Sequence, residues 1–196
     1  MLTSITPLGE RGKGNRWGVT AAAYVLGSVV GGATLGLLGG ALGTALARVM
    51  TAQVALWVLA AACVGAAVAD LSGRRLPSWH RQVDEQWLQA FRGWVYGAGF
   101  GVQLGFGLVT IITSASTHVM VLATVLAGSV PGGLAIGAAF GLVRGLAILA
   151  VRSVDDPEQL SRFHRGMEER ARTAQGVTIG SLLVGGALLA VLGVGA

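Results

Sequence analysis

The hydrophobic positions of this chain fall into five long runs, separated by polar connections. The runs cover residues 18–42, 52–69, 94–113, 119–143 (with possible continuation to 151) and 177–194. A helix needs about 20 mostly apolar residues to cross the hydrocarbon core of a bilayer, and each run is close to that length. The pattern therefore predicts an all-α, polytopic integral membrane protein with about five transmembrane helices.

Composition narrows the class of protein further. Of the 196 residues, 53% are hydrophobic and only 12% are charged, with a mean hydropathy of +0.69. Soluble domains carry about 25% charged residues. A soluble enzyme, a disordered tail and a disulfide-stapled module are therefore excluded. No catalytic triad, nucleotide fingerprint or paired carboxylate stands at useful spacing, so we expect no enzymatic activity and no cofactor.

Basic residues are concentrated in alternate connections, which decides the expected orientation. The N-terminal segment and the connections 70–93 and 144–175 hold all but one of the 14 Lys and Arg residues; the exception is Arg48. We therefore expect a protein of the cell's inner (plasma) membrane. The positive-inside rule places its N-terminus in the cytoplasm and its C-terminus outside. An uncharged turn at 114–118 is expected outside. Because topology explains the net charge of +5, we expect no nucleic-acid partner.

These boundaries divide the chain into six segments. They are a cytoplasmic N-terminal segment (1–16), a first pair of spans (17–69), a cytoplasmic interfacial helix (70–93), a second pair of spans (94–151), a cytoplasmic amphipathic helix (152–175) and a last span (176–196).

Both long cytoplasmic connections have helical periodicity. In the first, Trp79, Val83, Trp87 and Phe91 recur every four residues, and a Trp- and Arg-bearing helix of this kind suits the membrane surface. In the second, one face carries Leu160, Phe163, Met167, Ala171 and Ala174. The second helix fits either a solvated connector or a docking helix for a partner.

Glycines recur every four residues in three of the runs. The series contain Gly32, Gly36 and Gly40; Gly93, Gly97, Gly101 and Gly105; and Gly133, Gly137, Gly141 and Gly145. Spaced in this way on a helix, glycines form a nearly straight ridge that lets a neighbouring backbone approach closely. We therefore predict that these spans pack tightly through their glycine ridges.

An internal repeat appears when the sequence is shifted by 101 positions. The segment GSVVGG at 27–32 then meets GSVPGG at 128–133, and two further glycines stay in step. With the predicted topology the two copies run in opposite directions, as in many transporters whose interrupted helices form a site at the bilayer midplane. The expected interruptions are Gly31-Gly32 and Pro131-Gly132-Gly133, because proline removes a backbone donor. A packed kink without a cavity is the alternative.

The glycine-rich spans, the inverted repeat and the run YGAGFGVQLGFGLVT at 96–110 resemble the transmembrane core of the CcdA/DsbD-type cytochrome c biogenesis proteins and their LysE-like transporter superfamily. The resemblance covers about two thirds of the chain and implies a fold of two three-helix repeats. Here the arrangement is two spans plus three. The family's reactive cysteine beside proline is missing from the third span, so its electron relay does not carry over.

Few residues are candidates for chemistry within the spans. A possible solute path is suggested by the polar residues Gln103, Thr110, Ser28, Ser129, Pro131 and Thr34, although Ser and Thr often bond only their own helix. Arg144 can snorkel to the cytoplasmic surface. The single cysteine, Cys63, fits a small buried hydrophobe. The three histidines lie in three different connections, so we expect no metal site.

The preferred function is a transporter-like or channel-like membrane protein, or a non-catalytic subunit of a transport assembly, for a small neutral or anionic solute. A thiol-redox protein of the CcdA type working with partner cysteines, and a structural subunit of a larger complex, remain open. We also expect a homo-oligomer or a second membrane subunit, because the missing helix would expose the ridges of the first and third spans, including Gly97 and Gly101.

Overall fold

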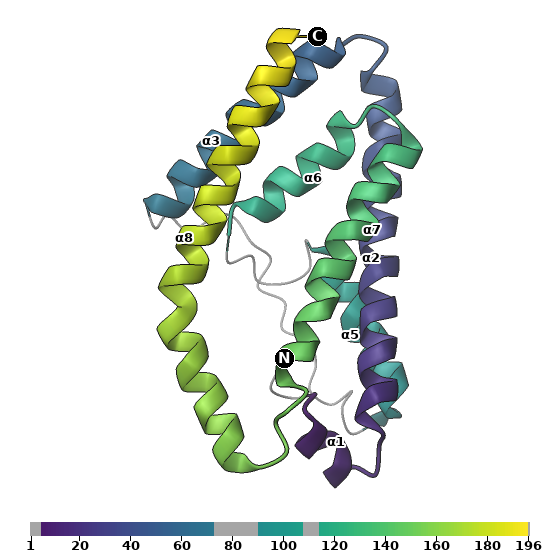
Figure 1. Cartoon of the computed structure of the whole chain (residues 1–196). Helices are drawn as coiled ribbons and strands as arrows, with labels where there is room; N and C mark the ends of the chain where they lie inside the picture. The colour runs from purple at the N-terminus through teal and green to yellow at the C-terminus, as the bar shows by residue number, and fades with distance from the viewer. Residues whose placement is uncertain (1–4, 73–89, 108–113, 196) are drawn as a thin grey trace.

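The computed structural model describes residues 5–72, 90–107 and 114–195, and within these ranges the regular structure is entirely helical (Figure 1). The helices are α1 (Pro7–Gly12), α2 (Trp17–Leu46), α3 (Ala52–Leu71), α5 (Gly93–Phe106), α6 (Ser116–Leu126), α7 (Val130–Leu146), the short 3₁₀ helix η2 (Ala147–Val151) and α8 (Pro157–Gly195). Trp79, Val83 and Trp87, on which the predicted interfacial helix depends, lie outside the described residues.

Four helical stretches are long and apolar enough to cross a membrane. They are Trp17–Leu46, Ala52–Leu71, Val130–Val151 and Pro157–Gly195. The first of them has 30 residues and is therefore about 45 Å long, more than the roughly 30 Å of a hydrocarbon core. The fold is that of a helical membrane protein, as the composition predicted.

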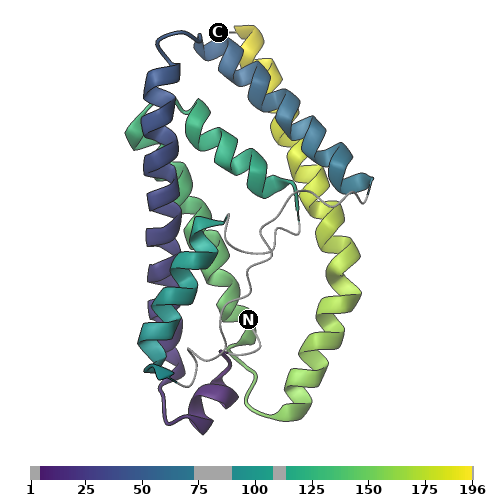
Figure 2. The ribbon, with the colours of Figure 1, turned by 180° about the vertical axis from the view of Figure 1, so that it is seen from behind.

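One side of the molecule is a three-helix group in which α2 packs against both α5 and α7 (Figure 2). Gly97 lies against the backbone of Thr20 and Gly105 against that of Ser28, so α5 runs parallel to the first half of α2. Along α7 the order is reversed, because Gly133 meets Gly36 and Gly141 meets Ser28. Because these glycines have no side chains, the two backbones touch at each of these positions. The reversed order of the contacts shows that α7 is antiparallel to α2.

The contacts between α2 and α7 are reciprocal. A Cβ atom on Gly32 would overlap the carbonyl oxygen of Gly137, and one on Gly137 would overlap that of Gly32. Gly36 and Gly133 have the same mutual relation. The 101-residue shift found in the sequence turns each of these two pairs into the other, so the shift exchanges two neighbouring pairs of the same helix contact.

The glycine ridges are occupied inside the chain. Gly97 and Gly101 meet the backbones of Thr20 and Tyr24 on α2. A second copy could reach these two glycines only by separating α5 from α2. These ridges are therefore filled by the chain's own helices, and the homo-oligomer or second membrane subunit stays a prediction.

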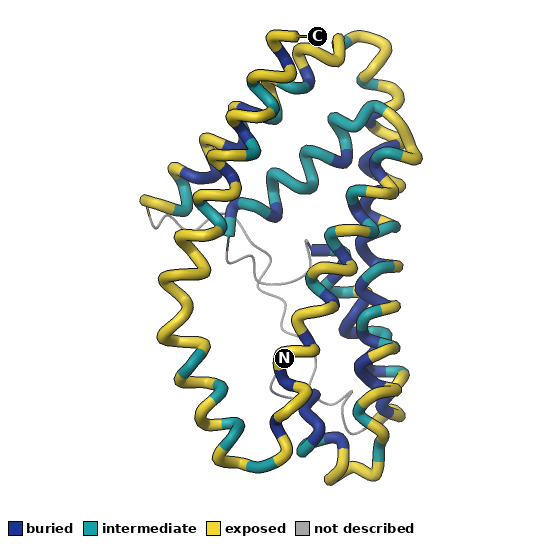
Figure 3. The backbone as a smooth tube through the Cα atoms, in the orientation of Figure 1, coloured by how far each residue is buried: buried dark blue, intermediate teal, exposed yellow. Residues whose placement is uncertain are grey.

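A second group is formed by α3 and α8. Gln53 Nε2 donates to the Gly193 carbonyl oxygen at 2.9 Å at one end, and Gln175 Nε2 donates to the Asp70 carbonyl oxygen at 2.9 Å at the other. The two helices are thus antiparallel. The first half of α8, before Gln175, is mostly exposed, as the yellow tube in Figure 3 shows.

Helix α6 connects the two groups, and it changes where the chain reverses. Ala115, just before α6, belongs to the core cluster of α3 and α8, whereas Val125 near its end meets Gly43 of α2. The reversal before α7 therefore lies at residues 127–129, beside Ala47, and the expected outer turn at 114–118 is wrong. The run 119–143 is accordingly two helices and not one span.

Of the two expected interruptions, one is present. The helix stops at Leu126 and resumes at Val130, with Gly128 at φ +64° and Ser129 as the N-cap of α7. Proline is favoured in the first turn of a helix, where its missing donor costs nothing, so Pro131 starts α7. In contrast, α2 continues through Gly31-Gly32, because glycine keeps its backbone donor; the expected break there is wrong.

Candidate functional site

The end of α5 lies against residues from two other helices. Gly107, at φ +72°, follows the last residue of α5. A Cβ atom built there would lie 3.3 Å from Phe140 Cε1, 3.5 Å from Thr117 Cγ2 and 3.5 Å from Arg144 Nη1. The end of α5, the beginning of α6 and the second half of α7 therefore meet around Gly107.

Arg144 points from α7 toward this meeting point. Its neighbour Gly145 is level with Val25 and Ser28 of α2, since a Cβ there would lie 3.2 Å from Val25 Cα and 3.0 Å from Ser28 Cβ. Gly105 is also level with Ser28, and α5 continues beyond that level to Gly107. The guanidinium group thus reaches away from the N-terminal end of α2. The expected snorkelling toward that end is wrong.

Aromatic side chains lie beside the guanidinium group. The Arg144 Cζ atom is 5.2 Å from the centroid of the Phe140 ring, within range of a cation–π interaction. Tyr24 of α2 is 2% exposed and within electrostatic range of Arg144. The cation is therefore held among helices α2, α5 and α7.

The helix ends give this position a defined electrostatic character. The C-terminal end of α5 carries partial negative charge from its last carbonyl groups, which favours a cation beside it. An intramembrane arginine in such a place marks a candidate site for a solute or ion. The planar guanidinium donates several hydrogen bonds and suits carboxylate-like anions.

Asp70, at the end of α3, fixes the beginning of α6. The Ser114 hydroxyl donates to Asp70 Oδ2 at 2.7 Å, and the Ala115 backbone N–H donates to Asp70 Oδ1 at 2.9 Å. A carboxylate at the start of a helix also opposes the positive end of its dipole. Asp70 thus holds α6 in the position from which Thr117 reaches Gly107.

The structure does not gather the path residues predicted from the sequence. The buried Ser28 hydroxyl donates to the Gly141 carbonyl oxygen at 2.7 Å, while the exposed Thr34 hydroxyl donates to its own helix at Val30. Ser129 caps α7 beside Gly40, twelve residues along α2 from Ser28, or about 18 Å. Pro131 is exposed, Gln103 is partly buried, and Thr110 lies outside the described residues.

One buried carboxylate was missed in the sequence. Glu10 of α1 is 0% exposed and accepts hydrogen bonds from the Thr20 hydroxyl, at 2.7 Å, and from the Tyr96 hydroxyl. Thr6 as N-cap and Pro7 in the first turn are a recognisable helix start. That signal predicts a short helix but cannot show that Glu10 is buried, because its partners come from α2 and α5.

Cys63 is separate from the two histidines that the structure describes, His118 of α6 and His164 of α8. Cys63 of α3 is buried against α8. A Cβ atom added to Gly186 of α8 would lie 3.1 Å from the Cβ atom of Cys63. In the parts of the chain that the structure describes, no three His, Cys, Asp or Glu side chains are grouped to hold a metal ion.

Comparison with known proteins gives two similar sequences from one genus. The chain is 29% identical over 195 residues to the methylamine utilization protein MauF of Paracoccus versutus, covering 96% of this chain and 71% of that protein. With MauF of Paracoccus denitrificans it is 29% identical over 197 residues, covering 97% and 71%. No family model and no solved structure matches. Over nearly its whole length, the chain is therefore similar to proteins named for methylamine utilization.

Proposed function

We propose that this chain is a transport-type membrane protein that moves a small solute, with Arg144 at the binding position. The observation that carries the proposal is the direction of Arg144, whose guanidinium group lies beside the end of α5 and among apolar helices. Charged groups are costly inside a membrane, and a cation that served only the fold would be expected at the surface. The proposal also keeps the N-terminus inside and the C-terminus outside.

In this proposal the third crossing is an interrupted one. Helices α5 and α6 both lead away from the N-terminal end of α2, and together they form one crossing of the membrane. Helix α7 then crosses back in the opposite direction. With 14 and 11 residues, each is too short to cross a bilayer alone. Interrupted crossings within inverted repeats are where many transporters bind their solute, because helix ends offer backbone groups there. The reciprocal contacts of α2 and α7 support such a repeat.

The charge at this position favours a class of solute. Arg144 attracts carboxylate-like anions through paired hydrogen bonds and repels cations. The similarity to methylamine utilization proteins suggests a role in the metabolism of methylamine. Methylamine is itself a cation at neutral pH, so we propose that the solute is a small neutral or anionic compound and not methylammonium.

The test is solute flux in liposomes that contain only this protein. Acetate serves as an anionic probe, glycerol as a neutral one and methylammonium as a cationic one. We expect wild-type protein to accelerate acetate or glycerol entry over protein-free liposomes, and Arg144→Gln to reduce acetate entry at least tenfold with Arg144→Lys intermediate. The matched control, Arg152→Gln, removes an exposed arginine just after η2 and should leave flux unchanged.

Two outcomes would count against the proposal. If no probe enters faster than into protein-free liposomes, transport by this chain is contradicted, and the structural-subunit interpretation is favoured. If Cys63→Ser abolishes activity while Arg144→Gln does not, a thiol-redox role is favoured instead. Because Cys63 packs between α3 and α8, and not on the helices that carry Gly107 and Arg144, we expect Cys63→Ser to leave flux intact.

A further inference from the structure

The polar segment that precedes α2 folds back against the helix core. Ile5 is 1% exposed and lies in a core cluster with Tyr24, Tyr96 and Ile148, which come from α2, α5 and η2. The Trp17 Nε1–H donates to the Ile5 carbonyl oxygen at 3.3 Å. Residues 5–16, which we call the N-terminal cap, therefore cover the end of the bundle at which α2 begins.

Glu10 fastens the cap to α2 and α5. Its carboxylate receives one hydrogen bond from Thr20 and one from Tyr96, and Asn15 Nδ2 donates to the Tyr96 hydroxyl oxygen at 3.2 Å. Gly93 leaves the space for this group, since a Cβ atom there would lie 3.0 Å from Glu10 Oε2. Glu10 thus stands on α1 and is enclosed by residues of α2 and α5.

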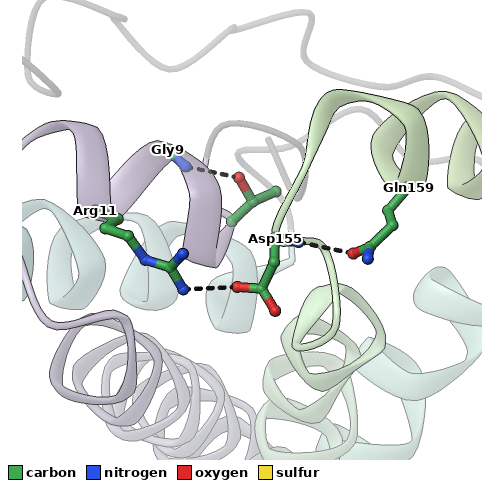
Figure 4. Close-up of polar contacts among 5 residues, drawn as sticks. Gly9, Arg11, Asp155 and Gln159 are labelled. Atoms are coloured by element: carbon green, nitrogen blue, oxygen red, sulfur yellow. Dashed lines mark hydrogen bonds and ion pairs between the residues drawn. The ribbon is translucent and has the colours of Figure 1, made fainter.

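A second attachment joins the cap to the segment before α8. The Leu8 backbone N–H donates to the Val154 carbonyl oxygen at 3.2 Å. Arg11 Nη2 is 2.8 Å from Asp155 Oδ1, and the two side chains face each other in Figure 4. This ion pair is exposed to solvent, so it adds little to the attachment.

The position of the cap relates it to Arg144. Tyr24 touches the cap through the cluster that it shares with Ile5, and it is also within electrostatic range of Arg144. A solute that approached Arg144 from this end of the bundle would have to pass Ile5 and Tyr24. Both side chains are buried in the cluster that they share.

We propose that the N-terminal cap is a plug, with Glu10 as its latch, that must detach before a solute can pass between Arg144 and the cytoplasm. This inference rests on the function and orientation proposed above. The latch suits reversible opening, because both donors to Glu10 are hydroxyl groups. When the cap detaches, the Glu10 carboxylate is hydrated by water again. Water can therefore replace the two bonds that opening breaks.

Thiol labelling of the full-length protein in nanodiscs tests the latch. With Cys63→Ala as background, Ala21→Cys places a thiol beneath the cap, at a position that is 5% exposed and in the same cluster as Ile5. A membrane-impermeant maleimide should label it slowly. Adding Glu10→Gln should raise the labelling rate about tenfold, since the amide cannot accept from both hydroxyls with the strength of a carboxylate.

Two controls separate local opening from unfolding. The first, Glu158→Gln, makes the same chemical change at an exposed position of α8 and should not alter labelling. The second places the reporter at Ala67, which is 0% exposed in the α3–α8 cluster, and it should stay protected in Glu10→Gln. Equal labelling of Ala21→Cys with and without Glu10→Gln would overturn the latch, as would equal acceleration at Ala67→Cys.

A disulfide lock tests the plug itself. Leu8→Cys and Val154→Cys, in the Cys63→Ala background, place two thiols on residues whose backbones are joined by a hydrogen bond, and formation of the disulfide is checked before flux is measured. Oxidation should reduce liposome flux at least tenfold and reduction should restore it, while Leu8→Cys alone should not respond. Undiminished flux with the disulfide formed would overturn the plug, whereas absent flux in the wild type would overturn the proposed transport and leave the labelling result to stand.

Discussion

Glycines carry different weight at different positions, and their spacing alone does not show which ones matter. Gly137 has the Gly32 carbonyl oxygen where its own side chain would be, whereas Gly185 of α8 has nothing within 4 Å of that point. The first is required by a helix contact and the second is not. The three regular series in the sequence did identify the contact positions, because close helix approach needs small residues one turn apart.

We predict that Gly137→Ala destabilises the protein by about 1–3 kcal/mol, since the added methyl group forces α2 and α7 apart. The matched control is Gly185→Ala, which should be neutral or slightly stabilising because alanine has the higher helix propensity. Unfolding of both variants in mixed micelles with increasing SDS measures the difference. Equal stability of the two variants would show that α2 and α7 are not in contact at this level.

Charged residues were the hardest to place from the sequence. The Glu10 carboxylate depends on Tyr96, 86 positions away, and the direction of Arg144 depends on where α5 ends. Neither relation has a local signature, because a pattern within a helix gives its faces but not its neighbours. The candidate site therefore emerged only from the tertiary arrangement, and the polar residues picked out along the spans proved to lie apart.

At the scale of helices, the sequence predicted where a helix begins better than it predicted where the chain turns back. Pro131 indicates the start of α7, because a helix tolerates proline only in its first turn. The sequence predicts a reversal at the uncharged stretch 114–118, because apolar runs flank it. The chain instead continues there into α6, anchored by Asp70, and turns at Gly128 in the left-handed region.

We predict that Asp70→Asn lowers the free energy of unfolding by about 2 kcal/mol, because hydrogen bonds from Ser114 and Ala115 lose their charged acceptor. Asp155→Asn is the comparison, since it removes a carboxylate from an exposed ion pair and should cost at most about 1 kcal/mol. Thermal unfolding in the same detergent measures both. A cost for Asp70→Asn no larger than that for Asp155→Asn would mean that α6 does not depend on this anchor.

At the scale of the whole molecule, composition and apolar run lengths were enough to predict a helical membrane protein, and the structure confirms that class. The arrangement of the crossings could not be predicted, because it depends on which short helices combine. An 11-residue apolar helix such as α6 is ambiguous in a sequence. Its contacts with both helix groups decide on which side of it the chain turns.

The last prediction concerns membrane topology, which follows from the turn at 127–129 and from the distribution of basic residues. In the Cys63→Ala background, Val49→Cys and Ser129→Cys should both label from outside, because the two exposed turns lie at the same end of the molecule. Arg165→Cys, on exposed α8, should label only from inside.

Ser114→Cys separates this arrangement from the one expected from the sequence. Its neighbour Ala115 is 2% exposed, and Ser114 itself bonds to Asp70 at the opposite end of α3 from the outer turn. It should therefore resist an impermeant maleimide applied from outside under conditions that label Ser129→Cys completely. Rapid outside labelling of Ser114→Cys would restore the turn at 114–118 and contradict the interrupted crossing, while outside labelling of Arg165→Cys would invert the orientation and with it the side that the N-terminal cap closes.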